Sequence, residues 1–153
     1  LKERNYLFKL LEIYIIEKLE KLNNEKIKIK ILGEKKFYNK LNKLLDFAEK
    51  KTISNTKLQI NLALNYGSKK EILYAFNKLK KRSKISENDI SNNLYTKNIP
   101  DPEILIRTGN RKRLSNFLLW QSSYTEIYFE KKLWPDFTKK DFRKIILNFF
   151  IIF

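Results

Sequence analysis

The sequence predicts an α/β fold in which a mostly parallel central sheet is flanked by helices. Segments with helical spacing of apolar residues alternate with short strand-like segments, an order typical of a parallel sheet with helices on both faces. The 153 residues, 42% of them hydrophobic and 14% aromatic, can bury a core and match the length of one domain. Because no repeat, linker or low-complexity block interrupts them, we expect a single domain over residues 1–153.

The first half of the chain predicts two helices and two strands. Apolar residues at helical spacing predict a helix over residues 3–22, and its wide apolar face predicts burial on more than one side. Strict alternation in KIKIKIL predicts a strand with one solvated face over residues 26–32. A polar helix over residues 37–51 and a second strand over residues 57–67 follow. A strand, a helix and a strand in this order form the repeating unit of a parallel sheet.

Three pairs of polar residues predict where helices begin in the second half. Each pair places Ser or Thr three residues before Asp or Glu, the pattern of a capping box, in which each side chain accepts a hydrogen bond from the other residue's backbone N–H. The pairs are Ser68 with Glu71, Ser86 with Asp89, and Thr138 with Asp141. We therefore expect helices to start at these three positions.

Two more strands and a short helix are expected between residues 103 and 129. The strands span residues 103–107, after a proline turn, and residues 126–129. Between them, Ser115 and Asn116 are expected to cap a short helix through about residue 122. The apolar run FLLW predicts that this helix is buried.

The absence of Cys and His excludes several kinds of chemistry in these residues. The chain has no disulfide, no Cys/His zinc site, no thiol nucleophile and no imidazole-based triad. Any chemistry must therefore use carboxylates, hydroxyls, cations or an added metal ion. No segment resembles a signal peptide, and no apolar run reaches the length of a membrane-spanning helix. We expect a cytoplasmic protein that can associate peripherally with a membrane surface.

A strong positive charge predicts an anionic ligand. The chain has 33 Lys and Arg against 17 Asp and Glu, a formal net charge of +16, which attracts phosphates, nucleic acids or anionic lipids. Lys, Asn and Ile are abundant throughout the chain, as in proteins from AT-rich genomes, and this bias explains much of the charge equally well. Only a local cluster of charge is therefore informative about a site.

Such a cluster lies in the segment RTGNRKRLSNFLLWQ, residues 107–121, where four cations precede an apolar run. Ligands of open parallel sheets bind beyond the carboxyl ends of strands, and Arg107 ends a predicted strand. Arg107 and Arg113 could bind phosphate oxygens bidentately, and backbone N–H groups near Ser115 favour an anion. The segment predicts a diphosphate site, although solvated arginines and an ordinary helix cap explain the same spacing.

Nucleic acid is the rival anion, since aromatic residues between cations can stack on bases. However, residues 117–120 follow the cations as one apolar block, which is typical of a buried helix and not of a row of exposed stacking rings. No RNP-like or helix-turn-helix pattern is present. The sequence therefore favours an amphiphile with an anionic head and a hydrocarbon body, and we expect no nucleic-acid partner.

Five sequence motifs occur in a specific order along the chain. They are NLALNYG at residues 61–67, RTG at residues 107–109, RLSNFLLWQ at residues 113–121, EIYF at residues 126–129 and LWPDF at residues 133–137. Together they closely resemble the motifs of the cis-prenyltransferase family, typified by undecaprenyl diphosphate synthase. The resemblance runs in register from the first helix to nearly the end of the chain. It implies that this chain corresponds to the C-terminal two-thirds of that family's domain.

The resemblance implies an enzyme that condenses isopentenyl diphosphate with an allylic diphosphate such as farnesyl diphosphate, forms cis double bonds and requires Mg²⁺. In the family, the residues that match Arg107, Arg113 and Ser115 bind the diphosphate of the isopentenyl unit. The residue that matches Glu126 contributes to the magnesium site. Without the resemblance, Glu126 would be interpreted as an ordinary charge at a strand edge.

The resemblance also implies partners and a path for the product. It implies a homodimer and a long-chain polyprenyl diphosphate that partitions into the membrane. In the family, the helix matching residues 6–19 and the strand matching residues 58–64 line a hydrophobic tunnel for the growing chain. For most of these side chains, core packing is the simpler interpretation.

The sequence departs from the family in four places, one of which is the pair Ser68 and Lys69, where glycine and arginine are common. The family's Asp-Gly-Asn-Gly-Arg loop, which supplies the catalytic aspartate, is absent, so no residue of this chain is assigned as catalytic. We expect that aspartate to lie upstream of Leu1, and we expect a fragment that is inactive alone. The alternative is a non-catalytic accessory subunit of a heteromeric prenyltransferase. Asn110 and Arg111 stand where a glycine and an acidic residue are usual, and the family's Arg-rich C-terminal tail is also absent.

Overall fold

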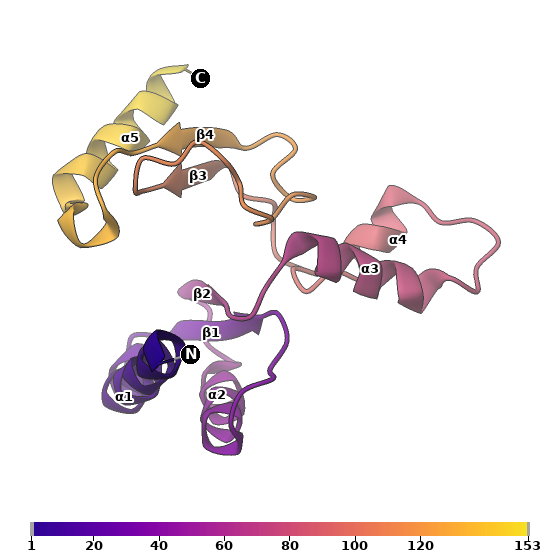
Figure 1. Cartoon of the computed structure of the whole chain (residues 1–153), viewed down its shortest axis with the longest axis horizontal. Coiled ribbons are helices and arrows are strands. Elements are labelled where there is room, and N and C mark those ends of the chain that lie inside the picture. The colour runs from indigo at the N-terminus through magenta and orange to yellow at the C-terminus, as the bar shows by residue number, and fades with distance from the viewer. Residues whose placement is uncertain (1, 153) are drawn as a thin grey trace. The chain divides into compact units, whose positions relative to one another are not determined.

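A computed structural model describes residues 2–152, which form two compact units (Figure 1). Unit 1 ends at Tyr66 and unit 2 begins at Gly67. Unit 1 contains α1 (Lys2–Asn24), β1 (Ile27–Leu32), α2 (Asn39–Thr52) and β2 (Leu58–Ala63). Unit 2 contains α3 (Ser68–Leu79), α4 (Glu87–Ser91), β3 (Ile104–Arg107), β4 (Glu126–Phe129), the 3-10 turn η1 (Trp134–Asp136) and α5 (Lys139–Ile152).

Leu1, upstream of which the catalytic aspartate is expected, lies outside the described residues. The expectation of an upstream aspartate therefore stays a prediction. It bears on the proposed function and not on the fold of the two units.

Two parallel strand pairs confirm the expected α/β class. In unit 1, β1 pairs with β2 in a register that sets Ile27 opposite Leu58. In unit 2, β3 pairs with β4 in a register that sets Ile104 opposite Glu126. A parallel pair needs a long crossover connection, and α2 is the crossover between β1 and β2. The crossover between β3 and β4 contains the cationic segment instead of a helix.

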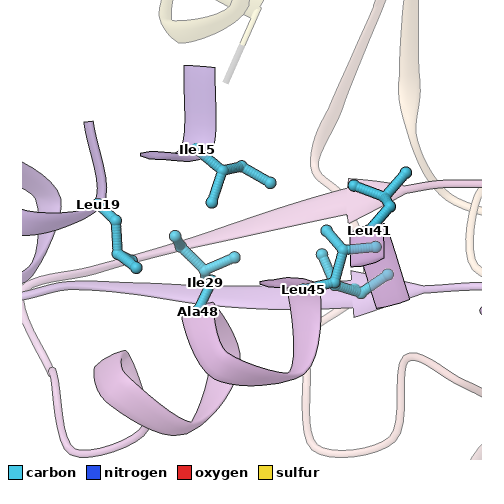
Figure 2. Close-up of a cluster of buried hydrophobic side chains, with 7 residues drawn as sticks. Ile15, Leu19, Ile29, Leu41, Leu45 and Ala48 are labelled. Atoms are coloured by element: carbon cyan, nitrogen blue, oxygen red, sulfur yellow. The ribbon is translucent and has the colours of Figure 1, made fainter. Parts of the chain in front are cut away.

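The core of unit 1 lies between α1, β1 and α2. It consists of Ile15 and Leu19 from α1, Ile29 and Ile31 from β1, and Leu41, Leu45 and Ala48 from α2. Figure 2 shows side chains from both helices gathered around Ile29. The three α2 residues are completely buried because their spacing places them on one face of the helix. This stripe explains why a mostly polar sequence forms α2.

The bounds of α1 agree with the expected helix, but its burial does not. Only one narrow stripe of its apolar side chains, which includes Ile15 and Leu19, is buried in the described structure. By contrast, Leu7 is 61% exposed and Ile16 is 57% exposed. The expectation of burial on more than one side is wrong here, because the sheet and α2 cover a single side of α1. No helix in the described part of the chain is long and apolar enough to cross a membrane.

The buried cluster of unit 2 lies between α3 and α4. Ala75 and Leu79 of α3 contact Ile90 of α4 and Leu94, and the half-buried Trp120 packs against this cluster. Trp120 belongs to the long β3–β4 connection. The helix pair therefore anchors the connection in which the cationic segment lies.

Two of the three expected capping boxes are confirmed. At α4, the Ser86 hydroxyl accepts a hydrogen bond from the Asp89 N–H, and the Asp89 carboxylate accepts one from the Ser86 N–H. At α5, the Asp141 N–H donates to the Thr138 hydroxyl and the Thr138 N–H donates to Asp141 at 2.8 Å. Both pairs satisfy backbone donors that a helix start leaves free.

The third expected capping box, between Ser68 and Glu71, is wrong. The N-cap residue of α3 is Gly67, which has no side chain, and Ser68 is the first helical residue. The side chains of Ser68 and Glu71 are both fully buried and bond to other parts of unit 2. The Ser-x-x-Glu spacing therefore marks the first turn of α3, but it does not form a capping box there.

The short buried helix expected after Ser115 is also absent. Ser115, Asn116 and Leu118 have φ angles of 49°, 63° and 44°, in the left-handed region, so the chain turns repeatedly instead of continuing as a helix. Phe117 is 40% exposed, so the FLLW run does not form a buried helical face. The apolar residues are distributed between the α3–α4 cluster and the surface.

Candidate diphosphate-binding site

Arg107, the last residue of β3, makes the central contacts of the predicted site. Its guanidinium donates a hydrogen bond to the hydroxyl of Ser115 at 2.9 Å and another to the backbone carbonyl of Arg113. The strand thus ends beside the loop that the sequence singled out. Of the three residues expected to bind a diphosphate, the structure joins Arg107 to the other two.

A shallow pocket of about 310 Å³ opens at these contacts. It is lined by residues from the end of β3 and from the following loop: Leu105, Ile106, Arg107, Thr108, Arg113, Leu114, Ser115 and Phe117. Two guanidinium groups and two hydroxyls thus share one pocket with apolar walls. This combination suits an anionic head group attached to a hydrocarbon.

The Arg113 side chain is exposed and available to a ligand. Within residues that the structure describes, its guanidinium has no hydrogen bond or ion pair, and only its carbonyl oxygen is engaged. An arginine whose five N–H donors face solvent can bind a diphosphate without first breaking a protein contact. Arg107, by contrast, must share its donors between Ser115 and a ligand.

The loop after Arg107 is held against the chain that follows β4. The N–H of Gly109 donates to the carbonyl of Lys132 at 2.7 Å, and the N–H of Asn110 donates to the carbonyl of Glu130 at 3.0 Å. Gly109 has a φ of 88°, a left-handed value that glycine adopts without strain. The unusual residue Asn110 also has a positive φ, 55°, which asparagine tolerates better than most residues.

Glu126, the expected metal ligand, lies away from Arg107. Residues opposite each other in a parallel pair point to the same face, and successive residues alternate between faces. Arg107 is opposite Phe129, which is three positions after Glu126, so Arg107 and Glu126 point to opposite faces of the strand pair. The Glu126 side chain is exposed. The described residues contain no group of three or more acidic side chains that could hold a metal ion.

Several residues that hold the loop were not predicted as functional. Gln121, which is 3% exposed, donates to the carboxylate of Glu71 at 3.1 Å and to the hydroxyl of Thr96 at 2.8 Å. Asn116 accepts hydrogen bonds from the first residues of α3. The sequence interpretation gave the cap of α3 to Ser68, so it offered no reason to expect a distant one. Gly67, which as the N-cap residue has no side chain, explains why Asn116 can take that role.

Unit 1 contains a larger cavity of about 810 Å³ beside α1. Glu12, which is 8% exposed, lies in its wall and accepts hydrogen bonds from the ammonium of Lys40 and, at 2.6 Å, from the hydroxyl of Tyr38. These two donors hold the pKa of Glu12 below its usual value, and the carboxylate in turn raises the pKa of Tyr38. Lys9 and Lys36 add further positive charge to the wall.

A second, apolar cavity in unit 1 bears on the expected tunnel. It measures about 200 Å³ and is lined by Leu11, Tyr14, Ile15 and Leu22 of α1, Ile29 of β1, and Ile60 and Leu62 of β2. Both segments expected to line a tunnel, residues 6–19 and 58–64, therefore contribute side chains to one apolar space. Its walls carry no charged group.

Comparison with known sequences finds one family over almost the entire chain. A family model described as "Putative undecaprenyl diphosphate synthase" matches residues 1–151. An isoprenyl transferase of Rickettsia typhi is 41% identical over 150 residues, which are 96% of this chain and 66% of the relative. An isoprenyl transferase of Thermotoga maritima is 39% identical over 155 residues, covering 97% of this chain and 66% of the relative. The chain thus spans slightly less than two thirds of these relatives.

Solved structures agree with the sequence comparison. A crystal structure of a probable undecaprenyl diphosphate synthase from Campylobacter jejuni superposes with a TM-score of 0.86 at 36% identity, over 97% of this chain and 71% of that one. A lavandulyl diphosphate synthase from Lavandula x intermedia, solved in complex with dimethylallyl diphosphate, gives a TM-score of 0.91 at 28% identity. That match covers 97% of this chain and 68% of the lavender enzyme.

Proposed function

Because this chain belongs to the undecaprenyl diphosphate synthase family, we propose that it is part of a cis-prenyltransferase that condenses isopentenyl diphosphate with an allylic diphosphate. The expected single domain over residues 1–153, a homodimer, and a long-chain polyprenyl diphosphate product that partitions into membrane are parts of this proposal. The allylic substrate is of the farnesyl diphosphate type.

The contact between Arg107 and Ser115 carries the proposal. In the condensation, the terminal alkene carbon of isopentenyl diphosphate forms a bond to the allylic carbon, whose diphosphate leaves with the bonding electrons. A proton is then lost from the isopentenyl unit and leaves a new cis double bond. The isopentenyl diphosphate group itself stays intact throughout, so it needs only binding and orientation, which two arginines and a hydroxyl provide.

Magnesium is part of the proposal, with Glu126 as its one candidate ligand in this chain. A magnesium ion is usually held by one or two carboxylates together with substrate phosphates and waters, so a single exposed carboxylate fits its preferences. When bound, the ion would neutralise diphosphate charge. Since Glu126 and Arg107 point to opposite faces of the strand pair, we propose that Glu126 does not contact the diphosphate that Arg107 binds in the same chain.

A non-catalytic accessory subunit is the second candidate. It shares the proposed role of Arg107, Arg113 and Ser115, and it places the family's Asp-Gly-Asn-Gly-Arg loop on another polypeptide. Such a subunit would bind isopentenyl diphosphate and leave the chemistry to a partner chain. Both candidates assign the same role to the arginines, and they differ in whether the catalytic aspartate belongs to the same polypeptide, upstream of Leu1.

Titration of isopentenyl diphosphate into the 153-residue chain, followed by isothermal calorimetry, tests the site. Arg107→Ala and Arg113→Ala should each weaken binding by about tenfold or more, because hydrogen bonds to charged groups contribute about 1.5–3 kcal/mol. Arg111→Ala is the matched control, since it removes the same charge from the same loop, and its effect should stay within about threefold. An equal effect of all three substitutions would identify the arginines as ordinary surface cations.

The same chain is then incubated with farnesyl diphosphate, radiolabelled isopentenyl diphosphate and Mg²⁺. We expect binding without long-chain product, because no residue of the chain is assigned as the catalytic aspartate. Long-chain product from the chain alone contradicts both the assignment of an inactive fragment and the accessory subunit. Addition of candidate partner chains that carry the missing loop then distinguishes the two candidates.

A further inference from the structure

The hydroxyl of Ser115, which accepts a hydrogen bond from Arg107 at 2.9 Å, belongs to an unusual backbone segment. Ser115, Asn116 and Leu118 all have left-handed φ angles, between 44° and 63°. Serine and leucine rarely adopt this conformation, since the side chain then crowds the following carbonyl oxygen. Such a segment persists only where its surroundings hold it in place.

Hydrogen bonds from the first turn of α3 to Asn116 hold this segment in place. The N–H of Ser68 donates to the backbone carbonyl of Asn116 at 2.9 Å, and the N–H of Lys69 donates to its side-chain oxygen Oδ1, also at 2.9 Å. Asn116 thus caps α3 from a distance of 47 residues in sequence, in place of the side chain that Gly67 lacks. One residue satisfies two backbone donors that α3 leaves free.

The segment is also fixed on its far side. The N–H of Leu119 donates to the buried hydroxyl of Ser68 at 3.0 Å. Two residues later, Gln121 donates to Glu71, and the same carboxylate accepts a hydrogen bond from the N–H of Tyr95 at 2.7 Å. Leu118 therefore lies between two sets of bonds to α3, and Ser115 directly precedes the first set. Of these contacts, the Asn116 cap is the one adjacent to Ser115.

We propose that Asn116 is a positioning residue of the diphosphate site: by capping α3 it holds Ser115 in the conformation that places its hydroxyl 2.9 Å from the Arg107 guanidinium. Asn116 itself does not contact the diphosphate. The inference rests on the proposed function and adds a residue to it that acts through Ser115. It also gives a reason for the glycine that precedes α3.

Gly67 provides a specific probe of this contact. A Cβ atom at position 67 would lie 2.8 Å from Nδ2 of Asn116, closer than real Cβ contacts allow, and no other atom except Asn116 Cγ would lie within 4 Å. The φ of Gly67 is −161°, an extended value that alanine adopts without strain. Gly67→Ala should therefore act by displacing the Asn116 side chain.

The test compares four variants by calorimetric titration of isopentenyl diphosphate into the 153-residue chain. Asn116→Ala and Gly67→Ala should each weaken binding by about tenfold, because Ser115 then loses the neighbouring contact that holds its hydroxyl toward Arg107. The corresponding free energy is within the range by which a lost helix cap destabilises a protein. In the double variant, Gly67→Ala should add less than about twofold, because the alanine that replaces Asn116 has no Nδ2 for the new methyl group to displace. Ser86→Ala is the matched control: it removes the cap of α4 and should leave binding within about twofold.

Amide hydrogen exchange on the same proteins reports the cap directly. The Lys69 amide should be protected in the wild-type chain and lose protection in Asn116→Ala, while the Asp89 amide stays unchanged. An unprotected Lys69 amide in the wild type overturns the inference, as does equal diphosphate binding by wild type and Asn116→Ala. If the wild type binds no isopentenyl diphosphate, the proposed function falls and the inference falls with it.

Discussion

The carboxylate of Glu71 is completely buried in unit 2, and hydrogen bonds compensate for its loss of water. Glu71→Gln keeps the shape but turns one acceptor oxygen into a donor, which must then face the N–H of Tyr95 or the amide of Gln121. A buried donor without an acceptor costs about 1–3 kcal/mol, so we expect the free energy of unfolding to fall by that amount. Urea unfolding followed by circular dichroism measures it.

The matched control for this prediction is Glu87→Gln in α4. Glu87 is exposed, so the same chemical change should alter the free energy of unfolding by less than about 0.5 kcal/mol. Equal effects at both positions would mean that the hydrogen bonds of Glu71 do not stabilise unit 2.

At the scale of single residues, the sequence selected side chains that lie together in the structure, and their ligand stays a prediction. Arg107 and Ser115 were selected from charge, spacing and family resemblance, and the structure sets them in contact. Asn116 and Glu71 were given other roles. Glu71 was assigned to a capping box, because the spacing Ser-x-x-Glu is the same whether the serine is the N-cap residue or the first residue of the helix. Asn116 was assigned to the cap of a helix that does not form. A sequence pattern identifies side chains that can accept a hydrogen bond from the backbone. It does not identify the backbone N–H that donates, because that N–H can lie on a segment distant in sequence.

At the scale of one element, the start of α5 predicts a pH dependence. The ammonium of Lys132, together with the hydroxyl and N–H of Thr138, holds the pKa of Asp141 well below its usual range. A carboxyl whose pKa is lower in the folded state stabilises the fold above its unfolded pKa of about 3.9. The stabilisation is lost as pH falls from there through the folded pKa.

Thermal melting between pH 7 and pH 2.5 tests this dependence in the wild type and in Asp141→Asn. Near pH 7 the Tm of the wild type should exceed that of Asp141→Asn. This difference should begin to narrow below about pH 4, where the carboxyl of the unfolded chain becomes protonated, and should keep narrowing down to pH 2.5. Asp101→Asn, at an exposed position in the connection before β3, serves as the control for general effects of charge. Parallel curves for wild type and Asp141→Asn would contradict the role of the cap.

For single helices and strands, apolar periodicity predicted some positions correctly and others wrongly. The positions of α2 and α5 followed from apolar spacing and, for α5, from its cap, because a helix satisfies most of its backbone hydrogen bonds internally. The position of β1 followed from its strict alternation of apolar and polar residues. The segment after Ser115 has an apolar run and cap-like residues but forms turns, since its backbone N–H and carbonyl groups bond to α3 instead. Local patterns cannot anticipate a conformation that distant partners impose.

At the scale of the whole molecule, the charge of +16 is spread over many residues, whereas the site depends on few. Unit 1 alone carries several lysines around the cavity of Glu12, away from the cationic loop in sequence. A distributed charge attracts any polyanion through the release of counterions, and such binding weakens steeply with salt. The net charge therefore predicts nonspecific association, and the loop predicts selective binding of a diphosphate.

A pair of titrations separates these two kinds of binding. Single-stranded RNA should bind the chain at low salt and lose most of its affinity, about 300-fold if some six phosphates are contacted, between 50 and 200 mM salt. The double substitution of Arg107 and Arg113 by Ala removes two of 33 cations, so RNA affinity should change only a few-fold, as expected for two of many phosphate contacts. Isopentenyl diphosphate binding should instead fall by more than about tenfold, because it loses both bidentate donors. RNA binding that resists salt and disappears in this variant would make the loop a nucleic-acid site and overturn the diphosphate assignment.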